Sequence, residues 1–215
     1  MIDSKTLTHQ LIDTGSVRLH VVEKGEGPVV VLLHGFPDFW YSWRNQIDAL
    51  VEQGYRVIVP DLRGYNSSDK PSAIADYRLD ALVQDVVGLI QAIGQGPVRL
   101  VGHDWGGIIA WMVANDYPEC VKHLVVVNMP HPERIISSLK KVSQSLRLSY
   151  LLLFQLPWLP EKVLRFDRFR LLKWFLKNQG PQSDAWSDEE LERYGIAHSH
   201  PGAFRAMVNY FRALR

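Results

Sequence analysis

A carboxylate stands at a crowded corner of this sequence, in the stretch LVGHDWGGIIAW at residues 100–111. An apolar run ends there, Asp104 follows, and a second apolar run begins after Gly106 and Gly107. With Gly102 two residues before it, Asp104 has the small neighbours that a sharp turn from a strand into a helix requires. Such a turn strains the backbone and exposes one side chain at the end of a sheet. The spacing therefore predicts that Asp104 is presented as a nucleophile.

A carboxylate in this position can attack an sp3 carbon without first losing a proton, and the product is an alkyl ester. Hydrolysis of that ester needs a base that activates water and donors that stabilise an oxyanion. The alternative is that Asp104 only caps the following helix, since Asp is a favourable N-cap residue. Residues 100–111 alone leave both interpretations open.

A second segment, LLHGFPDFWYSW at residues 32–43, also ends an apolar run. Gly35 allows a sharp turn there, and Pro37 fixes the loop that follows. The backbone N–H groups of Phe36 and Trp105 are expected to face each other across adjacent strand ends, which would form an oxyanion hole with two donors. The Phe36–Pro37 bond is a candidate cis peptide. The alternative is that the aromatic residues of this loop simply cover a core.

Strand-like and helix-like segments alternate along residues 28–128, after two N-terminal strands that turn near Thr14–Gly15. The predicted buried strands are 28–35, 55–61, 97–104 and 121–128, and the predicted helices between them are 43–54, 77–94 and 106–118. Short connections between such elements predict an α/β fold with a mostly parallel sheet and helices on both faces.

The pattern changes after Pro132, where the alternation stops. Helices are expected at 133–155, 160–178, 187–195 and 201–215, with a helix start at Ser187. The sequence therefore predicts a core at residues 1–132 and a helical cap at residues 133–215.

Composition excludes several classes of protein. The 215 residues carry a net charge of +1, which gives no electrostatic reason to expect a nucleic acid partner. The only cysteine, Cys120, is compatible with a reducing compartment. The N-terminus lacks the apolar segment of a signal peptide. The apolar stretch at residues 146–160 is too short to span a membrane. We expect a cytoplasmic protein with no metal, no nucleic acid partner and no membrane partner; a homodimer is compatible with the sequence.

Four segments in this order and spacing resemble the α/β hydrolases: HGFP (34–37), DLRGYNSSDKP (61–71), GHDWGG (102–107) and NMPHP (128–132). The resemblance is to the epoxide hydrolase branch, close to the haloalkane and haloacetate dehalogenases. It is strong over residues 5–132 and looser in the cap. It implies an enzyme without a cofactor that opens a hydrophobic epoxide to a diol, with Asp104 as the nucleophile and Phe36 and Trp105 as the oxyanion hole.

The resemblance also implies two cap tyrosines that protonate the epoxide oxygen. Tyr150 stands where the first is found, although a core aromatic residue on a greasy helix is the alternative. In VNYFRALR (208–215), Phe211 occupies the position of the second tyrosine and Tyr210 precedes it, so Tyr150 and Tyr210 are the candidates. Further residues expected around the substrate are His34, Pro37, Trp40, His103, Phe154 and Phe211.

The dehalogenases fit less well. Haloalkane dehalogenases usually have Asn where Phe36 stands, as a second halide donor. Haloacetate dehalogenases place an acid where this chain has Asn128, and they favour His-Trp where it has Ser149–Tyr150. Both comparisons favour an epoxide over a halide.

The family implies a histidine base and an orienting carboxylate after the cap, whereas this chain ends at Arg215. None of its eight histidines fits that role: His131 stands where the cap begins, and His198 and His200 are expected in a solvated cap loop. We expect a truncated hydrolase that lacks the C-terminal part of the core and is inactive in turnover. A catalytically inactive binding protein that uses the cap pocket is the alternative.

Overall fold

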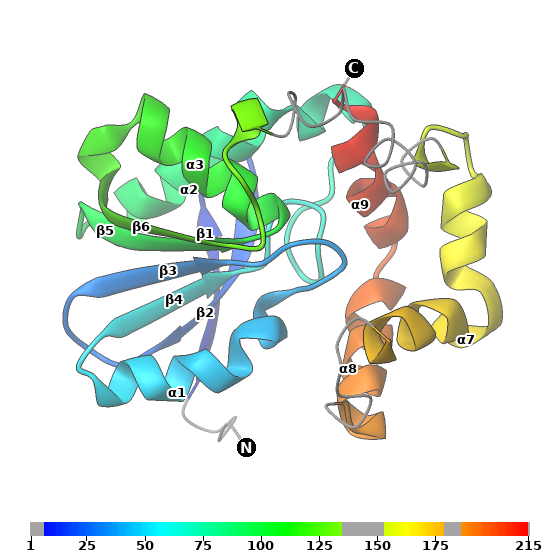
Figure 1. Ribbon diagram of the computed structural model, residues 1–215, viewed down its shortest axis with the longest axis horizontal. Helices are drawn as coiled ribbons and strands as arrows, with labels where there is room; N and C mark the ends of the chain where they lie inside the picture. Colours follow the sequence, from blue (N-terminus) through cyan, green and yellow to red (C-terminus); the bar gives the residue numbers. More distant parts are fainter. Residues whose placement is uncertain (1–6, 135–152, 179–185, 215) are drawn as a thin grey trace.

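The computed structural model describes residues 7–134, 153–178 and 186–214 (Figure 1). Its centre is a six-stranded sheet with the order β1-β2-β4-β3-β5-β6. The strands are β1 (Thr8–Asp13), β2 (Arg18–Lys24), β3 (Val29–Leu33), β4 (Arg56–Pro60), β5 (Val98–His103) and β6 (Val121–Val127). β1 and β2 are antiparallel to their neighbours, and β4, β3, β5 and β6 run parallel. The predicted mostly parallel α/β sheet is confirmed.

Helices cover both faces of this sheet. Figure 1 shows α1 (Arg44–Glu52) on one side and α2 (Leu79–Ile93) and α3 (Trp105–Asp116) on the other. All five residues of β3 are buried as a result, which explains its continuous apolar sequence. Short 3-10 turns, η2 (Trp40–Trp43), η3 (Ile74–Tyr77) and η4 (Pro118–Cys120), complete the connections.

Strand order brings two predicted loops together. β3 and β5 are adjacent and parallel, and their register pairs Leu33 with Gly102. The residues that follow each strand therefore leave the sheet side by side, although they are almost seventy positions apart in sequence. This places the Gly35–Phe36 turn next to Asp104, as the oxyanion-hole prediction required.

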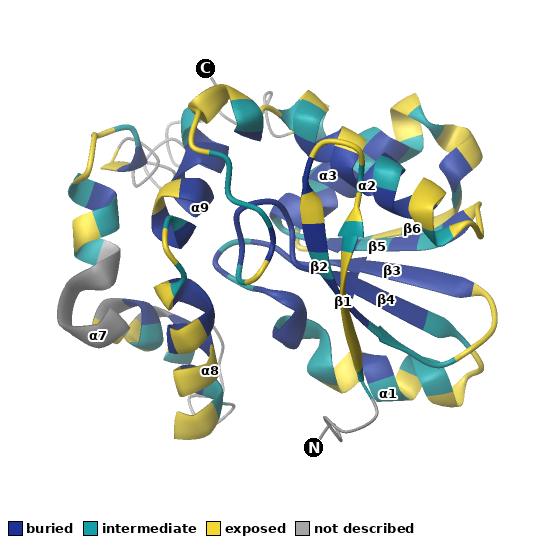
Figure 2. Cartoon of the chain, turned by 180° about the vertical axis from the view of Figure 1, so that it is seen from behind, coloured by how far each residue is buried: buried dark blue, intermediate teal, exposed yellow. Residues whose placement is uncertain are grey.

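Three helices, α7 (Leu159–Lys177), α8 (Asp188–Ser199) and α9 (Ala203–Arg212), stand beside the end of the sheet at which β3 and β5 finish (Figures 1 and 2). Ser187 caps α8 as predicted, and it exchanges hydrogen bonds with Glu190 in a capping box. α8 extends beyond the predicted end at residue 195, and α9 ends before residue 215. Most of the helix predicted at 133–155 lies outside the described residues. Within the described ranges, every helix is too short or too polar to span a bilayer.

The prediction that His198 lies in a solvated cap loop is wrong. His198 lies within α8, it is 2% exposed, and its Nε2 is 2.7 Å from the Pro37 carbonyl oxygen. Two more contacts join α8 to the core: the Tyr194 hydroxyl donates to Asp38 Oδ1 at 2.9 Å, and Arg44 pairs with Glu190 at 2.6 Å. Helix α8 is therefore tied to the loop that follows β3.

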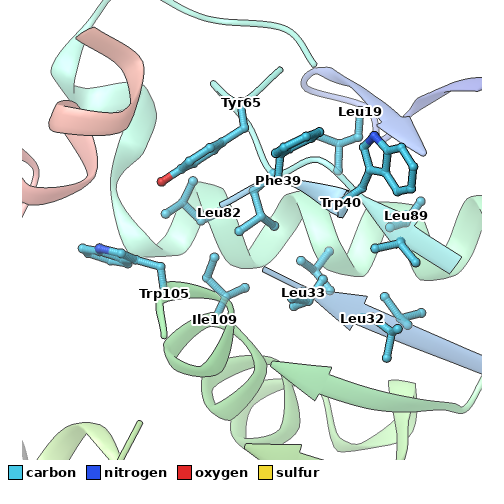
Figure 3. Packing of buried hydrophobic residues seen from close by; sticks show 14 of the residues in the cluster. Leu19, Leu32, Leu33, Phe39, Trp40, Tyr65, Leu82, Leu89, Trp105 and Ile109 are labelled. Atoms are coloured by element: carbon cyan, nitrogen blue, oxygen red, sulfur yellow. The ribbon is translucent and has the colours of Figure 1, made fainter. Parts of the chain in front are cut away.

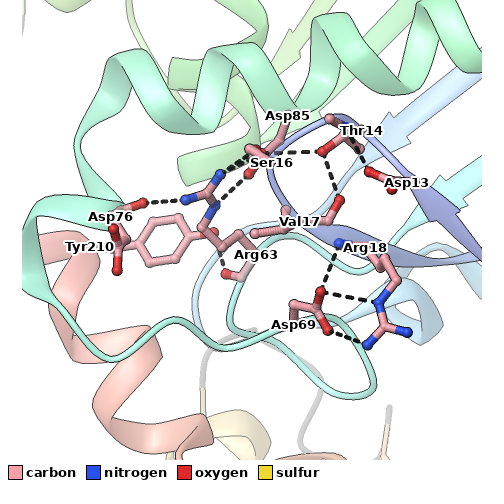
Figure 4. Close-up of polar contacts among 11 residues, drawn as sticks. Asp13, Thr14, Ser16, Val17, Arg18, Arg63, Asp69, Asp76, Asp85 and Tyr210 are labelled. Carbon is pink, nitrogen blue, oxygen red and sulfur yellow. Dashed lines mark hydrogen bonds and ion pairs between the residues drawn. The ribbon is translucent and has the colours of Figure 1, made fainter.

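A buried ion pair fixes the loop after β4 (Figure 4). The Arg63 guanidinium donates to both oxygens of Asp85 at 2.7 and 2.6 Å, to Ser16 Oγ and to the Asp76 carbonyl. Arg63 and Asp85 are 5% and 3% exposed as side chains. Burying two charges is costly unless further hydrogen bonds satisfy them, and here they do. The Arg63 carbonyl then accepts from the Tyr210 hydroxyl at 2.7 Å, so the same loop also holds α9.

Asp38 should give the core–cap contact a pH dependence. Burial raises the pKa of its carboxyl from 3.8 to about 6. Between about pH 4 and pH 6 the folded state therefore binds more protons than the unfolded state. The ionised carboxyl lowers the free energy of unfolding above pH 6, and this loss is recovered as the pH falls and the carboxyl is protonated. We expect the unfolding free energy of wild type to rise relative to the Asp38→Asn variant between pH 7 and pH 5, measured by urea unfolding.

Asp80→Asn is the matched control for this measurement, because the Asp80 side chain is 72% exposed. Its difference from wild type should stay constant across the same range. An Asp38→Asn curve that runs parallel to wild type at every pH would contradict the assignment.

Candidate active site

Asp104 occupies the sharp turn that the glycine spacing predicts. It lies between β5 and α3 with φ +51° and ψ −120°, a conformation that few non-glycine residues adopt. A Cβ atom on Gly102 would come 2.3 Å from the Gly106 carbonyl oxygen, and one on Gly106 would come 2.5 Å from the carbonyl oxygens of Leu33 and His34. Glycine is therefore required at both positions for the turn to close against β3.

The Asp104 side chain makes no capping hydrogen bond with α3. Its Oδ1 instead accepts from the backbone N–H of Phe36 at 2.9 Å. This contact also needs Gly35, because a Cβ atom there would lie 2.4 Å from Asp104 Cβ. The carboxylate is half-buried, so one oxygen is held while the group remains open to a reactant. That arrangement suits a nucleophile better than a helix cap.

The predicted oxyanion donors, the N–H groups of Phe36 and Trp105, both adjoin Asp104. The Phe36 N–H already contacts a carboxylate oxygen, which shows that an oxygen atom fits in front of it. Trp105 is the first residue of α3, where backbone N–H groups have no acceptor within the helix. The two groups could stabilise the oxyanion that forms when an ester on Asp104 is attacked.

Aromatic side chains from core and cap enclose this point. The Phe211 ring centroid lies 5.1 Å from that of Phe36, 5.4 Å from that of Trp105 and 4.9 Å from that of Phe154. Phe154 also contacts Phe36 at 5.6 Å. Two predicted lining residues, Phe154 and Phe211, are thus brought to the predicted oxyanion hole, and the wall they form is apolar.

Of the two candidate acids, Tyr150 and Tyr210, the structure describes only Tyr210. Tyr150 lies outside the described residues. The hydroxyl of Tyr210 donates to the Arg63 carbonyl, and burial raises its pKa well above the usual value. The Tyr210 ring still packs against Trp105, with centroids 5.3 Å apart. Tyr210 is therefore next to the site, but its hydroxyl is engaged in holding α9 on the core.

Three other predicted lining residues, His34, Pro37 and Trp40, follow β3 in the chain, and the His34 ring contacts the backbone. His34 is fully buried; its Nε2 accepts from the Leu62 N–H at 3.0 Å and its Nδ1 lies 2.9 Å from the Gly35 carbonyl oxygen. Burial lowers the pKa of His34 to about 4, so the ring is neutral. The Phe36–Pro37 peptide is cis, as predicted. Trp40 is 8% exposed and lies within the hydrophobic core cluster (Figure 3).

A cavity of about 300 Å³ opens at His103, the residue before Asp104, although Asp104 itself is not in its lining. Its lining residues are Asp38, Ser42, Trp43, Arg44, Gln46, His103, Val127, Asn128, Trp186 and Tyr194. His103 Nδ1 lies 3.8 Å from Asp38 Oδ2, and His103 Nε2 lies 3.4 Å from Asn128 Nδ2. No motif spacing marks Asp38 in the sequence, and its burial depends on α8. With a pKa of about 6, it can exist in both protonation states near neutral pH.

A larger groove of about 870 Å³ lies between η3 and the ends of α7 and α9, and its lining includes none of the residues around Asp104. Among the described residues, no three metal-binding side chains gather.

Comparison with known proteins agrees with this geometry. A family model for the alpha/beta hydrolase fold matches residues 28–173. The AB hydrolase superfamily protein YfhM of Bacillus subtilis is 44% identical over 210 residues, which cover 96% of this chain and 73% of that protein. Human epoxide hydrolase 4 is 39% identical over 208 residues, which cover 94% of this chain and 57% of its own length. This chain therefore spans little more than half of that human relative.

Solved structures give the same result. The epoxide hydrolase VrEH1 from Vigna radiata matches with a TM-score of 0.85 and 35% identity, over 99% of this chain and 73% of that one. An epoxide hydrolase from Bacillus megaterium matches with a TM-score of 0.88 and 34% identity, over 95% of this chain and 71% of that one. The chain belongs to the α/β hydrolase fold family, in its epoxide hydrolase branch.

Proposed function

We propose that this chain carries the nucleophile of an epoxide hydrolase that opens a small hydrophobic epoxide to a diol. The observation that carries the proposal is Asp104 itself, a carboxylate at a strained strand–helix turn with one oxygen held by the Phe36 N–H. The epoxide hydrolases among the relatives support it. The apolar wall of Phe36, Phe154 and Phe211 supports a hydrophobic substrate.

The first half-reaction forms an ester. The free oxygen of Asp104 attacks an epoxide carbon, the ring C–O bond breaks, and the electron pair stays on the departing oxygen. That oxygen takes a proton from Tyr150, the proposed first acid. Tyr210 is the second candidate, and it could donate only if its hydroxyl left the Arg63 carbonyl.

The second half-reaction hydrolyses the ester. Phe36 and Trp105 would bind the oxyanion through their backbone N–H groups. His34 and His198 are buried and contact backbone groups, so neither is free to activate water. We propose that the base and its orienting acid lie in the part of the relatives that this chain does not span. The boundary between a core at 1–132 and a cap at 133–215 belongs to the same proposal.

We further propose a cytoplasmic location, supported by the free, buried thiol of Cys120. A homodimer would bury the exposed valines of β6, Val125 and Val127, which are 51% and 38% exposed.

Replacing the nucleophile should abolish ester formation. With styrene oxide, intact-mass measurement should show one base-labile adduct on the wild-type chain and no base-labile adduct on the Asp104→Asn variant, because a neutral amide is a poor nucleophile. Asp116→Asn, at the exposed end of α3, is the control and should react like wild type. Normal alkylation of Asp104→Asn would show that another group attacks.

Removing the proposed acid should slow ring opening. We expect Tyr150→Phe to lower the single-turnover alkylation rate by about 10²–10⁴-fold, the usual contribution of a general acid. Tyr55→Phe is the control. Tyr55 immediately precedes β4, at the opposite end of the strand from the site, so the loss of its hydroxyl should leave the rate unchanged. An unchanged rate for Tyr150→Phe would make Tyr150 a wall residue only.

A further inference from the structure

In the part of the chain that the structure describes, four tyrosine side chains are fully buried: Tyr65, Tyr77, Tyr194 and Tyr210. Three of their hydroxyls donate to fixed acceptors. Tyr77 donates to the Pro71 carbonyl at 2.8 Å, Tyr194 to Asp38 at 2.9 Å and Tyr210 to the Arg63 carbonyl at 2.7 Å. The Tyr65 hydroxyl is enclosed and has no hydrogen-bond partner among the described residues. A buried polar group without a partner is rare and costs stability, so it requires an explanation.

The loop around Tyr65 is otherwise well satisfied. Its backbone N–H donates to the Leu62 carbonyl at 3.0 Å. The Asn66 side chain donates to Asp61 Oδ2 at 2.7 Å, and the Ser68 hydroxyl donates to the Asp61 carbonyl at 2.6 Å. The unpartnered hydroxyl is therefore not a sign of a loosely packed loop; it is one exception in a rigid segment.

Tyr65 packs between the His34 and Tyr210 rings, next to the residues that surround Asp104. Its ring meets the His34 ring edge-on at 4.7 Å, and His34 precedes the Gly35–Phe36 turn. On the other side its ring lies 5.4 Å from Tyr210, which packs on Trp105. Figure 3 shows the hydroxyl pointing away from Phe39 and Trp40. Besides burial, the charge of Asp104 raises the pKa of Tyr65 well above its usual value, so the phenol keeps its proton and can donate.

We propose that the Tyr65 hydroxyl is a substrate-binding donor of the active site, which bonds the oxygen that an epoxide presents beside Asp104. This rests on the proposed function. Phe211, on α9, has no hydroxyl that could contact the substrate. Tyr65, in the loop after β4, has one, and its ring contacts Tyr210, the neighbour of Phe211. As Asp104 attacks and the ring C–O bond breaks, negative charge grows on that oxygen and strengthens the bond from Tyr65. Tyr65 keeps its proton throughout.

Tyr65→Phe tests this, with Tyr77→Phe as the matched control. Two measurements are made on each variant of the full chain: the single-turnover alkylation rate with styrene oxide, and calorimetric binding of 1-phenylethane-1,2-diol, which carries the same oxygen without the reactive ring. Thermal unfolding is recorded alongside. Tyr65→Phe breaks no hydrogen bond seen in the structure and should keep or raise the melting temperature, whereas Tyr77→Phe should lower it.

We expect Tyr65→Phe to slow alkylation on the order of 10²-fold, the loss typical of one oxyanion donor, and to weaken diol binding about tenfold. Tyr77→Phe should change neither. If wild type binds the diol in a Tyr65-dependent manner but is never alkylated, the Asp104 reaction fails and the Tyr65 site stands. If Tyr65→Phe reacts and binds like wild type, or if wild type neither reacts nor binds, the assignment of Tyr65 is overturned.

Discussion

The hydrogen bond from the Phe36 N–H to Asp104 Oδ1 is the contact on which the rest of the site depends. It joins two loops that leave adjacent parallel strands, and it exists only because Gly35, Gly102 and Gly106 leave no side chain in the way. The strained backbone of Asp104 is retained because β5, α3 and the β3 loop all constrain it. A carboxylate held in this way is oriented before any reactant arrives, which lowers the cost of reaching the transition state.

Cap placement depends on a second set of buried polar contacts. The Arg63–Asp85 pair fixes the loop after β4, and the Arg63 carbonyl holds Tyr210 of α9. On the other side of the site, Asp38 holds Tyr194 of α8. Because α9 carries Phe211 as well as Tyr210, the contact that occupies the Tyr210 hydroxyl also brings Phe211 against Trp105, the residue after Asp104. The hydroxyls of Tyr194 and Tyr210 are therefore both engaged in holding α8 and α9 on the core.

The sequence pattern is sufficient to predict the strands and helices of the core, because each of them is marked by residues that are close together in the chain. The apolar runs of β3, β4 and β5 and the glycines around Asp104 predict both the parallel sheet and the turn. The cap was harder, because its helices are defined by what they pack against. The sequence predicts a solvated loop at His198, yet the residue lies in α8 with its ring buried against the Pro37 carbonyl oxygen. Asp38 and Tyr65 could not be found from spacing, since burial by distant elements gives them their unusual environments.

Locating the adduct is the most direct test of the central claim that Asp104 is the nucleophile. Epoxides also alkylate thiols and imidazoles without an active site, so added mass alone does not identify the reacting group. The wild-type chain would be treated with styrene oxide, digested, and sequenced by tandem mass spectrometry. The account predicts a single base-labile ester on Asp104, within the peptide that spans the β5–α3 turn. An adduct found instead on Cys120 or on a histidine, with Asp104 unmodified, would contradict it.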